Sequence, residues 1–185
     1  MPKTTLISHL SAPTFNNDFA LQLVSMLEQS VFSEYIKTAS PSLKKYDTVL
    51  AHIGSVAFCF VLEKKPSSST VPENFYWELS SLILKHTEQW LAHLKTYLEI
   101  RPLGSSTMIN HEVIRLQLGE LNAQFIFSKQ NMNAPIFNQQ LFEFFLNEQI
   151  LILKKIAKLT GGRAGLCGEV FEFVYFIKFL FTLIC

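Results

Sequence analysis

The chain has few charged residues, and those it has are balanced. Charged side chains make up 17% of its 185 residues, and the formal net charge is +1 at pH 7. A protein that binds nucleic acid normally carries a basic face or stripe. The composition therefore argues against a nucleic-acid partner.

Cysteine is also scarce. Cys59, Cys167 and Cys185 form an odd set without the spacing of a metal site. Two of the three lie in apolar runs, where a free cysteine packs as a small hydrophobic residue. This usage favours a reducing, cytoplasmic environment over a disulfide-bonded secreted domain.

Neither a targeting signal nor a membrane-spanning run is evident. Residues 1–15 contain one lysine and no continuous apolar segment, unlike a secretory signal peptide. The apolar run over 170–185 is interrupted by Glu172 and Lys178, and it is shorter than the roughly 20 residues that a spanning helix needs. We therefore expect a buried helix there and no transmembrane helix.

The residue patterns of common catalytic sites are missing as well. None of the five histidines stands three residues after a glutamate, so the di-iron bundle signature is absent. His86 and His93 share a helical face without a matching carboxylate pattern, and we expect no metal site. Cys59 has no charged neighbour that would mark a reactive thiol, and neither a nucleophile elbow nor a phosphate-binding P-loop occurs. The sequence assigns no catalytic residue.

What the chain does contain is apolar residues at helical spacing. Hydrophobic residues make up 49% of the sequence, and seventeen of them are phenylalanine. This composition is more apolar than that of a typical soluble domain. A chain of this length can enclose one core. After residue 70, apolar positions recur every three or four residues and predict four helices, with a turn over 101–108 where proline, glycine and serine gather. These predicted helices cover 73–100, 110–129, 137–159 and a last segment after Gly168.

Two further helices are predicted before residue 70. One starts at the capping residues 16–18 and ends near Ile36, and the other starts at Ser40-Pro41 and continues to Phe60. The segment 56–62 could instead be a strand. A polar stretch over 64–69 then marks a boundary. The sequence thus predicts an all-α chain, with an N-terminal helical segment over 1–65 and an up-down four-helix bundle over 73–185.

Three short motifs within the bundle region resemble a known family. The motifs are Arg101-Pro102-Leu103-Gly104, Leu118-Gly119-Glu120-Leu121, and the run Leu-Thr-Gly-Gly-Arg-Ala-Gly over 159–165. In this order they resemble the carboxy-terminal helical domain of acyl-CoA dehydrogenases. The resemblance spans roughly residues 72–185.

The resemblance implies a flavin site. In that family, the arginine of the first turn and the residues around the paired glycines contact the pyrophosphate and adenine of FAD across a subunit interface. The residues that would contact FAD here are Arg101, Gly104, Lys158, Gly161, Gly162 and Arg163. A glycine pair at a helix end is also common as a C-cap followed by a tight turn, and Lys158 could equally be a solvated last-turn lysine.

The same resemblance leads to three expectations for function. The first is a truncated or degenerate acyl-CoA dehydrogenase-like domain without independent dehydrogenase activity, because Cys185 stands where most of the family has its glutamate base and no β domain precedes the bundle. The second is an FAD-dependent subunit completed by a partner chain, with an acyl-CoA ligand. A helical interaction module unrelated to flavin is the third, and a gene fragment without a settled function also remains open. In each functional case the apolar surface predicts a homo- or hetero-oligomer.

Overall fold

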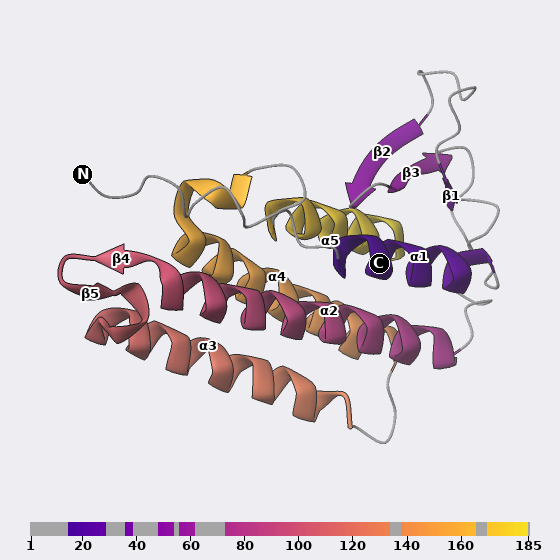
Figure 1. Ribbon diagram of the computed structural model, residues 1–185. Helices are drawn as coiled ribbons and strands as arrows, with labels where there is room; N and C mark the ends of the chain where they lie inside the picture. Colours follow the sequence, from indigo (N-terminus) through magenta and orange to yellow (C-terminus); the bar gives the residue numbers. More distant parts are fainter. Residues whose placement is uncertain are drawn as a thin grey trace.

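The computed structural model describes residues 15–28, 36–38, 48–53, 56–61, 73–133, 138–165 and 170–184. Within them the chain is mainly helical, with a small antiparallel sheet formed by strands within residues 36–61 (Figure 1). The elements, in chain order, are α1 (Phe15–Glu28), β1 (Ile36–Thr38), β2 (Thr48–Ile53), β3 (Val56–Val61), α2 (Glu73–Ile100), β4 (Pro102–Leu103), β5 (Ser106–Thr107), the 3-10 helix η3 (Met108–Asn110), α3 (Glu112–Asn131), α4 (Gln139–Thr160), the 3-10 helix η4 (Gly161–Gly165) and α5 (Val170–Ile184).

Helices α2 to α5 form the predicted bundle, and successive helices run in opposite directions (Figure 1). Helix α4 packs against α2, α3 and α5. Its ends show why it forms: the side chain of Asn138 accepts a hydrogen bond from the Leu141 amide at the start, and Gly161 caps the other end with a φ of 66°. The prediction of a helical bundle is confirmed, with helix boundaries within about two residues.

The second N-terminal helix was a wrong prediction. Strands β2 and β3 pair antiparallel over this segment, from Thr48 opposite Val61 to Ile53 opposite Val56, and β1 pairs with the other edge of β3. The run Val-Ala-Phe-Cys-Phe-Val in β3 is rich in β-branched and aromatic residues, which favour strands. The strand alternative is therefore the correct one over 56–61. Residue 62, and the start of the predicted helix over 40–47, lie outside the described residues.

The first N-terminal helix is confirmed as α1, although it ends before the predicted position, because Ile36 is the first residue of β1. Buried Phe19, Ala20 and Leu23 of α1 belong to the same apolar core as α2, α4 and α5. Helix α1 lies against α2, and α5 lies against β2. The division into segments 1–65 and 73–185 stays a prediction.

Helix α5 holds the apolar C-terminal run. Its residues Val170, Phe173, Phe176 and Ile177 are buried in the core of the bundle, as the sequence predicted for a buried helix. Within the described part of the chain, no helix combines the length and the apolar character needed to cross a membrane.

Candidate functional site

Arg101, the first residue that the resemblance singles out, lies immediately after α2. Its guanidinium group donates a hydrogen bond to the hydroxyl of Tyr97 and lies 5.3 Å from the centroid of that ring. The Arg101 carbonyl accepts from the Met108 amide at 2.9 Å, which closes the hairpin of β4 and β5. Gly104 lies at the exposed tip of this hairpin with a φ of 61°, a conformation that glycine adopts without strain.

The glycine run lies at the end of α4. The Gly161 amide donates to the Ala157 carbonyl and so completes the last turn of the helix. Both Gly161 and Gly162 are exposed, and a Cβ added at either position would meet open space. The positive φ of Gly161 is therefore what requires glycine there, as the C-cap interpretation predicted.

The structure brings these two turns to the same end of the bundle. Tyr97, which is bonded to Arg101, donates a long hydrogen bond of 3.4 Å to the carbonyl of Thr160, the residue before Gly161. The side chain of Lys158 is exposed on α4, and the side chain of Arg163 lies outside the described residues. Because α2 and α4 both end here, their carbonyl ends face this region and favour cations over phosphate. Among the described side chains, those of Arg101 and Lys158 are the cations that could bind a phosphate here.

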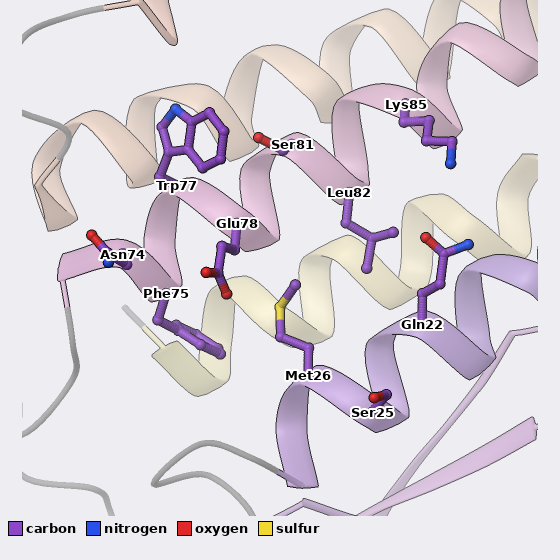
Figure 2. Close-up of a pocket in the computed structure, with 10 residues that line it drawn as sticks. All are labelled: Gln22, Ser25, Met26, Asn74, Phe75, Trp77, Glu78, Ser81, Leu82 and Lys85. Carbon is purple, nitrogen blue, oxygen red and sulfur yellow. The ribbon is translucent and has the colours of Figure 1, made fainter.

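A second candidate site is an open groove of about 660 Å³ between α1 and the first half of α2. Its apolar lining consists of Met26, Phe75, Trp77 and Leu82; Phe75 and Leu82 are almost fully buried, whereas Trp77 is half exposed. In Figure 2 the side chains of Met26, Phe75 and Leu82 reach toward the space between the two helices. The volume falls within the range of about 300 to 1,000 Å³ that is usual for small-molecule sites.

The polar side chains of the groove add an electrostatic pattern. Glu78 and Lys85 both project from α2 toward α1 (Figure 2). They are exposed, and neither forms an ion pair with another described residue. Seven residues, or two helical turns, separate them on the same face of α2, which corresponds to about 10 Å. The remaining polar lining residues are Gln22, Ser25, Asn74 and Ser81.

A third feature is a histidine enclosed by aromatic rings. His86 is only 1% exposed, and its ring contacts those of Phe15, Phe19, Trp90 and Phe173 at centroid distances of 4.2 to 6.4 Å. Burial lowers the pKa of His86 to about 3, although a hydrogen bond with Gln89 opposes the shift. The sequence placed His86 and His93 on one helical face but did not show that His86 is buried.

Metal ligands do not cluster in the described part of the chain: no group of three or more histidine, cysteine, aspartate or glutamate side chains is arranged to hold an ion there. The two candidate sites are the groove between α1 and α2 and the end of the bundle where Arg101 and Gly161 lie.

The groove was not found by sequence reasoning. Its walls come from two helices that are far apart in the chain, and spacing within one helix cannot show which helix will lie opposite. The spacing of Glu78 and Lys85 gave no signal either, because α2 carries further exposed charged residues, such as Glu88 and Lys95, at regular spacing.

Comparison with known proteins gives no relative from which a function could be transferred: the chain matches no protein-family model, no curated protein and no solved structure. The resemblance to acyl-CoA dehydrogenases thus stays a prediction from the three motifs.

Proposed function

We propose that this chain is a helical binding module whose site is the groove between α1 and α2. The observation that carries the proposal is the combination of an apolar floor with two oppositely charged side chains that have no ion-pair partner among the described residues. Small-molecule sites typically combine apolar walls with a few polar groups that orient the ligand. The groove therefore suits an amphipathic ligand.

The test uses the dye 1-anilinonaphthalene-8-sulfonate, which pairs an aromatic body with one anionic group. We expect saturable fluorescence enhancement with a stoichiometry near one, because the rings can pack on the apolar lining, of which Met26 and Trp77 are the more exposed members, while the sulfonate meets Lys85. The variant Ser81→Phe fills the groove and should abolish this binding. Ala92→Phe adds the same ring to an exposed position of α2 outside the groove and should leave binding intact. Equal binding by both variants would remove the groove as the site.

A nucleotide cofactor at the bundle end is the second candidate function. It is supported by the Tyr97 contacts that link Arg101 to the end of α4, since the acyl-CoA dehydrogenase resemblance expects FAD at these two turns. In this alternative the chain is a degenerate dehydrogenase-like domain that holds the edge of FAD, alone or with a partner chain, and an acyl-CoA is its possible ligand. The absorbance spectrum of the purified protein tests it directly, because bound flavin is yellow.

A variant pair locates the flavin if one binds. We expect Arg101→Ala to weaken FAD binding by about 1.5 kcal/mol, the loss of one charge-assisted hydrogen bond at an exposed position. Arg115→Ala, which removes an exposed arginine of α3, is the matched control and should bind FAD as the original chain does. Equal affinities in a fluorescence titration would exclude Arg101 from the site.

We also propose an oligomeric state and a cellular location for the chain. Large apolar side chains are exposed on α3, including Leu116 and Phe127, and we propose that they are covered in a homo- or hetero-oligomer. Cysteine usage supports a cytoplasmic location. Detection of the chain by cell fractionation, with the cysteines free to react with a thiol reagent, would support this location.

A further inference from the structure

The charge arrangement of the groove narrows the class of ligand. Glu78 offers a carboxylate near Phe75, and Lys85 offers an ammonium group two turns further along α2, near Gln22 (Figure 2). Both groups project to the same side of the helix, so a single ligand lying along the groove can meet both. The rise of two helical turns is about 10 Å, so such a ligand needs a positive group and a negative group separated by a distance of this order.

The groups between these two charges add a second requirement. Ser81, in the turn between Glu78 and Lys85, and Ser25 of α1 both line the groove, and each carries a hydroxyl. These groups can donate and accept hydrogen bonds. Leu82 forms the apolar floor in the same interval. A ligand with polar groups between its charged ends can form hydrogen bonds with these hydroxyls, whereas a ligand with an alkyl chain leaves them to water.

Resting on the proposed binding function, we propose that the groove binds a short peptide with free termini, its amino group at Glu78 and its carboxylate at Lys85. An extended chain advances about 3.3 Å per residue, so a tripeptide spans about 10 Å. Its peptide groups provide the donors and acceptors that the serine hydroxyls can meet, and a central apolar side chain covers Leu82. Peptide length, terminal charges and central side chain thus all match the groove.

The experiment is isothermal titration calorimetry with the tripeptide Ala-Leu-Ala in four forms: free, N-acetylated, C-amidated and capped at both ends. We expect the free form to bind the original chain, and each cap to weaken binding about fivefold, the effect of losing one exposed ion pair. The capped forms preserve the apolar side chain and the peptide groups, so any difference reports the termini.

Two variants of groove residues test which terminus of the peptide lies at Glu78 and which at Lys85. Glu78→Gln should bind the free and N-acetylated peptides equally while still distinguishing the amidated form, and Lys85→Gln should show the reverse pattern. Glu99→Gln and Lys95→Gln change the same residue types at exposed positions of α2 outside the groove, and they should retain both preferences.

The outcomes separate this inference from the proposed function. Equal binding of the free and doubly capped peptides, or no binding of any form, overturns the peptide inference. Dye binding that Ser81→Phe abolishes would still support the groove as a binding site in either case. If Lys85→Gln rather than Glu78→Gln removes the sensitivity to acetylation, the assignment of the two ends is wrong.

Discussion

At the residue scale, His86 is a titratable side chain that is almost completely removed from water. Its Nε2 atom is buried without a hydrogen-bond partner, and the rings of Phe19 and Phe173 lie within 4.5 Å, centroid to centroid. A charged imidazolium cannot be solvated there, so burial favours the neutral form. This is why the pKa of His86 falls to about 3 from its usual value of 6.5.

The lowered pKa of His86 predicts that the folded protein becomes less stable in acid. Below pH 6.5 the unfolded chain binds a proton at His86 that the folded chain does not bind, so the free energy of unfolding decreases as the pH falls. The slope contributed by this group is about 1.4 kcal/mol per pH unit, down to the folded pKa of about 3. Urea unfolding between pH 7 and pH 4.5 should show that His86→Leu loses this slope.

The control for that experiment is His111→Gln, which replaces an exposed histidine just before α3. It should retain the slope of the original chain. If His86→Leu and the original chain lose stability in parallel as the pH falls, the acid sensitivity does not come from His86.

The paired glycines after α4 offer a second residue-scale prediction. Gly161→Ala should lower the free energy of unfolding by about 1 kcal/mol, because alanine is strained at the positive φ of this position. Gly162→Ala should change it little, because this glycine lacks a positive φ and an added Cβ meets open space. Urea unfolding of the two variants measures the difference, and equal losses would contradict the C-cap interpretation of Gly161.

At the element scale, a buried polar pair joins α3 to α4. The side-chain amide of Gln149 donates to the Ser128 hydroxyl at 2.7 Å, and both side chains are almost fully buried. The other amide atom of Gln149, Oε1, has no hydrogen-bond partner. A buried pair of this kind fixes how the two helices lie against each other but contributes little net stability over an apolar contact.

A double-mutant cycle tests this view of the helix contact. Ser128→Ala should cost about 1 to 3 kcal/mol, because it leaves the buried Gln149 amide without a partner. The double variant Ser128→Ala, Gln149→Leu removes both polar groups and should recover much of that loss. Denaturant unfolding of the two single variants and the double variant gives the coupling energy. Simple addition of the two single losses would show that the pair is not coupled.

At the scale of the whole molecule, the sequence predicted where the helices lie in the chain better than how the elements pack against each other. The helices over 73–160 have caps and regular apolar spacing, such as Asn138 before α4, and these local signals are physical causes of helix formation. The helix prediction failed over 48–61, where Leu50, Ile53 and Ala57 also have helical spacing. Pairing between β2 and β3 determines the structure there, and spacing alone cannot show pairing.

The candidate sites likewise depend on contacts between elements, which the sequence did not predict. The family resemblance assigned Arg101 and the residues at the end of α4 to one cofactor, across a subunit interface, and did not predict that they lie at the same end of one chain. Tyr97, which makes the contact, was not singled out by any motif. The groove depends on α1 lying antiparallel to α2, with Phe15 beside Trp90 and Met26 beside Phe75. That arrangement is a property of the assembled core and not of either helix alone.

The outer surface of α3 leads to the last prediction, which concerns assembly. Four large apolar side chains are about half exposed or more there: Val113, Leu116, Ile126 and Phe127. At 100° per residue they fall within one half of the helix surface. They form two pairs, one near the start and one near the end of α3. Single exposed apolar residues are ordinary, but several on one side of a helix are a feature of interaction surfaces. We therefore expect the purified chain to form a dimer or a larger oligomer at micromolar concentration.

Sedimentation velocity measures this assembly, and Phe127→Lys should shift it toward the monomer, because burying a lysine without a partner at the contact is unfavourable. Leu21→Lys replaces an exposed leucine of α1, on another element, and should leave the distribution unchanged. A monomer at all concentrations would contradict self-association and leave a hetero-complex as the remaining form of the proposal. If both lysine variants dissociate the oligomer equally, the contact is not specific to α3.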